Sequence, residues 1–160
     1  MIPLKIQIDI DGSIPEDVCT IHCQSITPEI LKIQDAINGI LGNSGQFVCY
    51  KEETEFYIPI KDILFFETAG DIIHVHTASE VYTTGYRLYE LEELLPSGFM
   101  RISKSTILNT GRVYSLTRNL TASSVITFHD TPKKVYVSRH YYHSLREKLD
   151  EKHRSSFPQN

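Results

Sequence analysis

The sequence predicts a mainly β protein with a few short helices, preceded by a small β-β-α extension. The first observation is that short apolar or alternating runs follow one another from residue 47 onward, separated by turn-forming residues. The second is that apolar residues recur at helical spacing within residues 28–41, residues 87–95 and the stretch after residue 138. The third is a separate strand-and-helix pattern in residues 1–45.

The N-terminal extension, residues 1–45, begins with two expected strands. Apolar and polar residues alternate over residues 4–11, Gly12 follows in a turn, and residues 18–23 alternate again. A period of two is typical of half-buried strands, so we expect these two segments to pair as a hairpin.

A helix is expected to complete the extension. Ser25 or Thr27 can cap it, Pro28 lies in its first turn, and Gly42 is its expected end, with residues 42–45 as a linker. Its apolar face comprises Ile30, Leu31, Ile33, Ile37, Ile40 and Leu41. A unit this small buries little surface by itself, so we expect it to pack on the β region or on a second copy of the chain.

The β region, residues 46–151, opens with a predicted hairpin of residues 47–50 and 55–60. Because proline cannot donate a ladder hydrogen bond, Pro59 indicates either that the second strand lies at a sheet edge or that Pro59 is near the end of the strand. Residues 62–68 contain the continuous apolar run Ile-Leu-Phe-Phe, which suits a strand that is buried on both faces. Ala-Gly-Asp at residues 69–71 follows as a tight turn.

Further strands and two helices complete this region. The expected strands are residues 73–77, 80–84, 112–116, 124–128 and 134–137. The apolar face of a short helix over residues 87–95 is formed by Leu88, Leu91, Leu94 and Leu95. Ser138 is the expected N-cap of the last helix, where Val137 can pack on Tyr142, and residues 152–160 are expected to form a tail.

Residues 99–109 have a composition that sets them apart. Phe99-Met100 and Ile107-Leu108 enclose the polar and cationic residues 101–106. Ser, Lys and Thr side chains contact phosphate oxygens, and Lys also reaches acceptors on base edges. The segment is therefore a candidate nucleic-acid contact, and the alternative is a solvated corner between two strands.

Charge is unevenly distributed along the 160 residues, whose net charge is -4. Residues 1–46 carry two bases against six acids, residues 47–100 three against ten, and residues 101–160 eleven against four. A basic C-terminal third on an acidic body fits a face that binds a polyanion. The alternative is a solvated basic helix at the end of the chain.

The first turn of the last expected helix carries two basic residues, Arg139 and His140. Cations are unfavourable there because the positive end of the helix dipole lies at the N-terminus, at about 0.3–1 kcal/mol each. An anion bound at the same place explains them better, so Arg139 is a candidate nucleic-acid contact.

No cluster of residues points to a metal, a cofactor or an enzyme. His74 and His76 share a strand face without a convincing third ligand, so we interpret them as surface histidines. Cys19 and Cys23 share a face with Ile21 and are expected to be core thiols. The odd cysteine count, with no visible signal peptide or membrane span, predicts reduced thiols in a cytoplasm. No phosphate loop or nucleophile elbow occurs.

Several motifs occur in an order that resembles a known family. They are Tyr-Ile-Pro-Ile at 57–60, Asp-Ile-Leu-Phe-Phe-Glu-Thr at 62–68, Gly-Asp at 70–71, Leu-Tyr-Glu-Leu-Glu at 88–92, Arg-Ile-Ser-Lys-Ser at 101–105, Asn109 and Val-Ser-Arg at 137–139. As an ordered set they are similar to the LytTR-type DNA-binding domain. The resemblance implies an elongated β-sandwich that inserts loops into the DNA major groove.

The resemblance also implies the residues that contact DNA. They are Lys104, Arg139, Ser103, Ser105, Asp71 and His140. Lys104 is the first choice for a base contact and Arg139 the second, the two serines are expected at phosphates, and His140 assists. The chain departs from the family in carrying Lys104 where other members can have Asn, and in the anionic Asp71, which shapes its turn or accepts from a cytosine amino group. Glu67 and Asn109 are assigned to structure.

Two classes of function follow. The first is a sequence-specific transcriptional regulator, a homodimer on paired half-sites of double-stranded DNA, whose residues 1–45 serve dimerisation or control, with a regulatory protein as a further partner. Those residues are too few for a phosphorylatable receiver domain, so the input signal is expected from elsewhere. The second is a protein-interaction or ligand-sensing module whose functional part is the extension.

Overall fold

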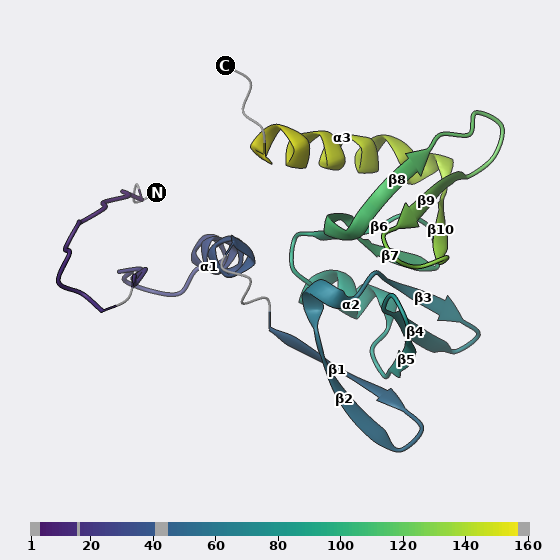
Figure 1. Ribbon diagram of the computed structural model, residues 1–160, viewed down its shortest axis with the longest axis horizontal. Coiled ribbons are helices and arrows are strands. Elements are labelled where there is room, and N and C mark those ends of the chain that lie inside the picture. The colour runs from purple at the N-terminus through teal and green to yellow at the C-terminus, as the bar shows by residue number, and fades with distance from the viewer. Residues whose placement is uncertain (1–3, 16, 41–44, 157–160) are drawn as a thin grey trace.

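The computed structural model describes residues 4–15, 17–40 and 45–156, and these form two antiparallel sheets and three α-helices (Figure 1). The strands are β1 Gln46–Lys51, β2 Thr54–Pro59, β3 Phe65–Ala69, β4 Ile72–His76, β5 Val81–Thr84, β6 Phe99–Arg101, β7 Thr106–Asn109, β8 Val113–Thr117, β9 Ser124–Phe128 and β10 Lys134–Val137. The helices are α1 Pro28–Ile40, α2 Leu88–Leu94 and α3 Arg139–Ser156. None of them is long and apolar enough to cross a membrane.

The larger sheet has the order β2-β1-β5-β4-β3-β7-β6, and the smaller has the order β10-β9-β8. The predicted β1–β2 hairpin is confirmed, and Pro59 ends β2 at the edge of the sheet, where a missing N–H costs no ladder bond. The strands predicted at 124–128 and 134–137 coincide with β9 and β10.

Strand β3 is buried on both faces, as its continuous apolar run predicted, and it separates two hydrophobic cores. Phe66 packs in the core beneath α2, whereas Phe65 packs in the core shared with the smaller sheet and α3. The neighbouring strand β7 divides in the same way, with Ile107 in the first core and Leu108 in the second. Successive side chains of a strand point to opposite faces, so β3 and β7 join the two layers.

Two details of the β region differ from expectation. Leu94 is 61% exposed because the two-turn helix α2 points Leu88 and Leu91 at the core, and Leu95 continues that stripe. Helix α3 runs to Ser156 and so includes residues that were expected to form a tail. Asn109 has the expected structural role, since its amide donates to the Ile63 carbonyl at 2.9 Å.

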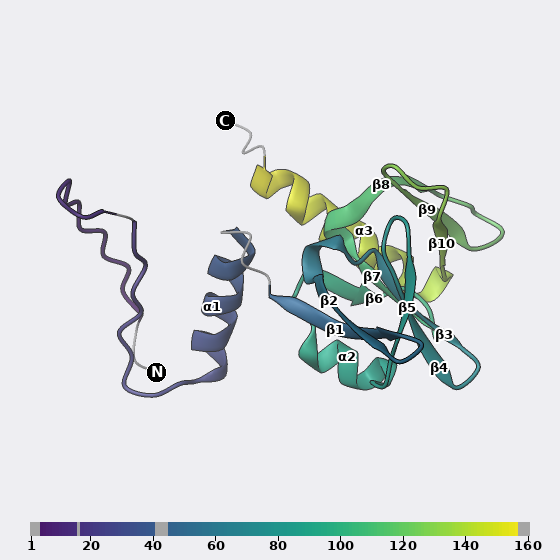
Figure 2. The same cartoon turned by 60° about the horizontal axis from the view of Figure 1, so that its bottom comes forward.

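In the N-terminal extension the helix is confirmed, and the strand prediction is wrong. Thr27 rather than Ser25 caps α1, accepting from the Ile30 N–H at 3.4 Å. The described residues before α1 contain no strand, and their alternating Ile6 and Ile8 are 88% and 81% exposed. An isolated pair of strands is marginal in water, and this segment lies away from the sheets (Figures 1 and 2). Gly42, Leu41 and residues 42–44 of the linker lie outside the described residues.

Candidate nucleic-acid interface

The polar segment between β6 and β7 forms a tight loop with Lys104 at its tip. Ile102 is fully buried, and its N–H donates to the Thr106 carbonyl at 3.0 Å, which closes the loop. The Ser103 hydroxyl accepts from the Ser105 N–H at 3.2 Å, and the two hydroxyls lie 3.3 Å apart. Lys104 is exposed, and within the described part of the chain its ammonium has no partner.

The Arg101 guanidinium holds this loop in shape. It donates from Nε to the Ser103 carbonyl at 3.1 Å and from Nη2 to the Lys104 carbonyl at 2.5 Å. Its Nη1 pairs with Glu92 at 3.1 Å, which connects the loop to α2. The sequence pattern grouped Arg101 with Lys104 as one cationic segment. The structure shows that their roles differ: Arg101 positions the loop, whereas the Lys104 ammonium is free of partners among the described residues.

Backbone hydrogen bonds connect the loop to the two other predicted contact sites. The Ser105 carbonyl accepts from the Thr68 N–H at 2.8 Å, on the strand that leads into the Gly70-Asp71 turn. The Ile102 carbonyl accepts from the Ser138 N–H at 2.9 Å, directly before Arg139. Three loops that are distant in the sequence are therefore held in a defined relation to one another.

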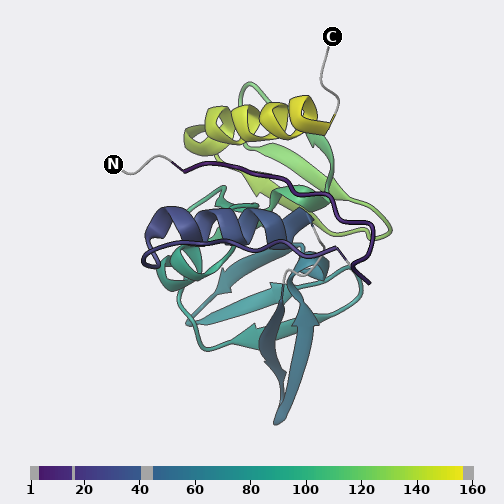
Figure 3. The ribbon, with the colours of Figure 1, turned by 90° about the vertical axis from the view of Figure 1, so that its left-hand side faces the viewer.

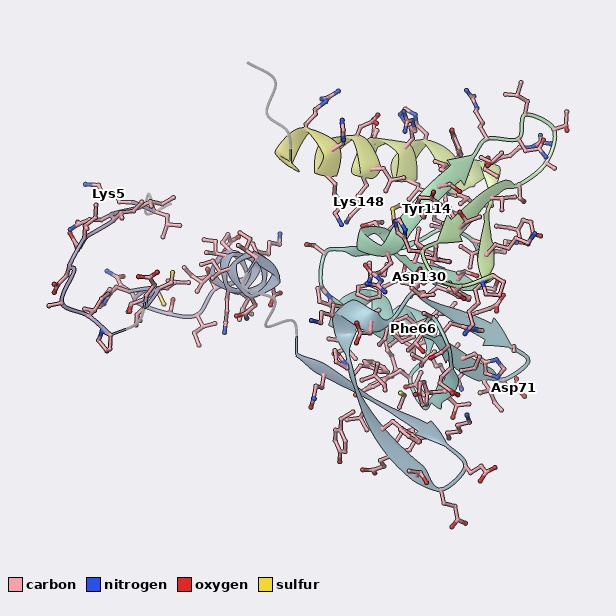
Figure 4. All side chains as sticks on the ribbon, in the orientation of Figure 1. Lys5, Phe66, Asp71, Tyr114, Asp130 and Lys148 are labelled. Carbon is pink, nitrogen blue, oxygen red and sulfur yellow. The ribbon has the colours of Figure 1, made fainter. Side chains whose placement is uncertain are left out.

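The β3–β4 turn presents Asp71 at the tip of its hairpin (Figure 4). Gly70 has a φ of +65°, a conformation that favours glycine, and it allows the two strands to reverse within two residues. Asp71 is exposed, and together with Lys104 it lines a hollow of about 660 Å³ on the surface. The structure thus brings Asp71 and Lys104 to one concave surface.

Arg139 and His140 lie exposed in the first turn of α3, as expected. The Ser138 carbonyl accepts from the N–H groups of Tyr141 and Tyr142, each at 3.1 Å, which begins the helix. The Arg139 guanidinium donates to the Thr121 carbonyl at 2.5 Å. This hydrogen bond directs the Arg139 side chain toward the β8–β9 loop.

That loop adds a second basic residue, which the sequence pattern did not single out. Arg118 and Arg139 both line a hollow of about 180 Å³, and Arg118 lies 5.3 Å from the centre of the Tyr142 ring. A cation over an aromatic face is attractive and limits the positions of the guanidinium. The only sequence signal for Arg118 was its place in the basic C-terminal third.

The two histidines on β4 are not alike, and the prediction that both are surface residues is wrong for His76. Its side chain is 14% exposed and stacks on Phe65 at 4.2 Å. Burial, with smaller contributions from the nearby Lys133 and His74, lowers the pKa of His76 to about 4. The imidazole is therefore neutral at pH 7, and Glu67, at 3.6 Å, is neither an ion pair nor a hydrogen-bond partner there.

The cysteines also differ from expectation. Cys19 and Cys23 are exposed rather than in a core, because the strand expected to bury them is absent from the described extension. Cys49 on β1 is buried, and desolvation raises the pKa of its thiol to about 11. Across residues 4–15, 17–40 and 45–156, no group of three or more His, Cys, Asp or Glu could hold a metal ion.

Comparison with known proteins identifies related domains. The family model for the LytTr DNA-binding domain matches residues 53–150. Two uncharacterized HTH-type transcriptional regulators of Staphylococcus aureus, from strains NCTC 8325 and MRSA252, are 29% and 28% identical over 147 residues, covering 91% of this chain and 98% of theirs. The solved LytTr DNA-binding domain from Bacillus cereus superposes with a TM-score of 0.61 at 21% identity, over 66% of this chain and 96% of that one.

Proposed function

This chain belongs to the LytTr DNA-binding domain family, and on that premise we propose that it is a sequence-specific DNA-binding transcriptional regulator. The names of its Staphylococcus aureus relatives, transcriptional regulators, support the same role. Because a transcriptional regulator acts on DNA, we also propose that the protein works in the cytoplasm. The proposal also fits the basic C-terminal third of the sequence.

We propose that loops, rather than a recognition helix, enter the major groove. In the described residues strands separate α1, α2 and α3 from one another, so no two consecutive helices form a helix-turn-helix pair. The observation that carries the proposal is the restrained loop around Lys104, which is hydrogen-bonded to the strand before Asp71 and to the residue before Arg139. Base contacts need side chains that are positioned in advance.

Each predicted residue has a chemical role in this proposal. The Lys104 ammonium donates to a base-edge acceptor such as O6 or N7 of guanine, and Arg139 makes the second base contact. Ser103 and Ser105 donate their hydroxyl protons to phosphate oxygens, and His140 assists nearby. The Asp71 carboxylate repels phosphate, so its place is beside the amino group of a cytosine.

We further propose that the chain acts as a homodimer on paired half-sites through its N-terminal extension. The described extension exposes a run of apolar side chains, and α1 adds Leu31 and Ile40, which are 48% and 85% exposed. Exposed apolar surface on this scale favours a partner surface. The match to the relatives spans 147 residues, more than the β region alone contains, so the relatives share part of this extension.

Replacing Lys104 with Ala tests the base contact. The probe is the DNA upstream of the protein's own coding region, because regulators often control their own operon. A lost base contact weakens specific binding by about 1–3 kcal/mol and relaxes preference at one position, whereas a lost phosphate contact weakens all sequences alike. Lys61→Ala is the matched control, because Lys61 is exposed and lines neither hollow.

The two possible failures are distinct. Normal operator binding by the Lys104→Ala protein would remove this loop from the interface while leaving the regulator intact. No binding of the wild-type protein to any upstream fragment at low salt would reject DNA binding and favour the interaction-module alternative.

A further inference from the structure

The hollow that Asp71 and Lys104 line extends well beyond the predicted contact residues. It lies over strands β4 and β5 and the start of α2, and its walls include Tyr86, Arg87 and Tyr89. Its volume of about 660 Å³ exceeds that of the second hollow, beside Arg139, at about 180 Å³. The sequence pattern predicted no role for these three wall residues.

The charges that line this hollow suit an anion. Three cationic residues line it, Arg87, Arg101 and Lys104, together with a single carboxylate, that of Asp71. Arg101 is already committed to Glu92 and to the loop carbonyls, so the cations left for a ligand are Arg87 and Lys104. The described part of the chain gives the Arg87 guanidinium no carboxylate partner within 4.0 Å.

The residues around Arg87 are held in place while their donors stay accessible. Glu90 accepts from the Arg87 backbone N–H at 2.7 Å, which fixes the main chain beneath the exposed guanidinium. The Tyr86 ring packs at 6.0 Å from buried Phe47, yet Tyr86 is 45% exposed, and Tyr89 is 61% exposed. A guanidinium and tyrosine hydroxyls are donors that proteins use toward phosphate oxygens.

We propose that the part of this hollow walled by Tyr86, Arg87 and Tyr89 receives the phosphate backbone of the bound DNA, with Arg87 as a phosphate contact and the two tyrosines as hydroxyl donors beside it. The inference rests on the proposed function. A duplex that places a base edge at Lys104 brings its flanking phosphates beside the same loop, because phosphates border each groove. The hollow is continuous with Lys104, so one polyanion satisfies Lys104 and Arg87 together.

Arg87→Gln tests the contact by its salt dependence, with Lys61→Gln as the charge-matched control outside the hollow. The probes are the upstream fragment and a duplex of unrelated sequence. Each phosphate contact contributes about 0.9 to the log-log slope of affinity against salt. We expect the slope of Arg87→Gln to be less steep by about 0.9 on both duplexes. When salt rises from 50 to 200 mM, the drop in affinity should therefore be about 3.5-fold smaller in Arg87→Gln than in the wild type. Lys61→Gln should keep the wild-type slope.

The Tyr86→Phe, Tyr89→Phe double variant gives a second measurement. It removes two neutral donors, so affinity should fall on both duplexes without a change in salt slope. Unchanged affinity and slope in Arg87→Gln, in a protein with the wild-type melting temperature, would overturn the inference. Weaker binding to the upstream fragment alone would also overturn it, because Arg87 would then read a base.

This inference and the proposed function fail differently. If Lys104→Ala weakens operator binding but Arg87→Gln does not, the regulator stands and the phosphate contact at the hollow is wrong. If the wild-type protein binds neither duplex at low salt, both are wrong.

Discussion

The N-terminal extension and strand β4 carry the same alternation of apolar and polar residues but have opposite environments. On β4, Ile73 is 7% exposed and Val75 is fully buried, whereas in the extension Ile6 and Ile8 are 88% and 81% exposed. Figure 3 shows the described segment before α1, in purple, as an irregular chain without strand arrows. β4 lies between β3 and β5, whose hydrogen bonds satisfy its backbone, and its apolar face packs in the core that contains Leu88 and Leu91 of α2. The difference shows that alternation indicates a strand only where another strand is within reach.

It follows that the β region holds the folding free energy and the extension is available for another role. Both hydrophobic cores consist of residues from β1 onward, and α1 contains no buried residue. The predictions that follow compare the two regions, from the largest expected effect on stability to the smallest.

Phe66→Ala and Ile8→Ala should differ most. Phe66 is fully buried and its ring lies 5.2 Å from that of Phe47, so truncation leaves a cavity and should cost about 3–5 kcal/mol in the free energy of unfolding. Ile8→Ala, an exposed truncation, should change it by less than about 0.5 kcal/mol. Urea unfolding measures both. A large loss in Ile8→Ala would show that the extension packs on the body.

Acid should destabilise the β region through His76. Its pKa is about 4 when folded and close to 6.5 when unfolded, so the unfolded chain takes up the proton first. The part of the free energy of unfolding that depends on a neutral His76 is fully present above about pH 6.5. It falls as the pH drops toward 4, by up to about 3 kcal/mol. When His76 is protonated in the folded protein, its imidazolium lies near Lys133 and His74, which disfavour the charge, and 3.6 Å from the Glu67 carboxylate.

His76→Phe keeps the stacking on Phe65 and removes the proton site. Unfolding titrations between pH 6.5 and 5 should therefore show a shallower pH dependence in His76→Phe than in the wild type. His22→Gln in the exposed extension is the matched control and should keep the wild-type slope. Equal slopes in all three proteins would contradict the burial argument.

Arg139→Ala should change stability little, although Arg139 belongs to the body. The substitution removes a hydrogen bond to Thr121 and also removes a cation from the positive end of α3, two opposing effects of about 1 kcal/mol or less. DNA affinity should nevertheless fall. Thermal melting and a gel-shift titration test the two halves, and marked destabilisation would make Arg139 a structural residue instead.

Deleting residues 1–45 should have the smallest effect on the stability of the β region and a clear effect on assembly. We expect an unchanged melting transition, one half-site bound, and loss of cooperative occupancy of two. Sedimentation of both proteins and titrations on one-site and two-site DNA measure this, with full-length Ile6→Asp, Ile8→Asp as the control for lost apolar surface. If the truncated protein still dimerises and fills two sites cooperatively, the extension serves only to cover the surface of the β region.

Much of the local structure could be predicted from the sequence. The pattern of residues 124–128 and 134–137 identified β9 and β10, the cap and apolar spacing identified α1, and the order of motifs indicated the family. These features depend on neighbours in the chain or on residue order, which a sequence displays directly. The two-sided burial of β3 was predicted for the same reason, since its apolar run has no polar face.

Tertiary structure alone decided the pairing of segments and the partner of each charge. No local pattern distinguishes an alternating segment with a neighbouring strand from one without, so the two strands expected in the extension were wrong. Nor does composition distinguish Arg101, held by Glu92 and two carbonyls, from the free Lys104. The hydrogen bonds from the Thr68 N–H to the Ser105 carbonyl and from the Ser138 N–H to the Ile102 carbonyl join distant parts of the chain, so the three loops of the proposed interface come together only once the sheet has formed.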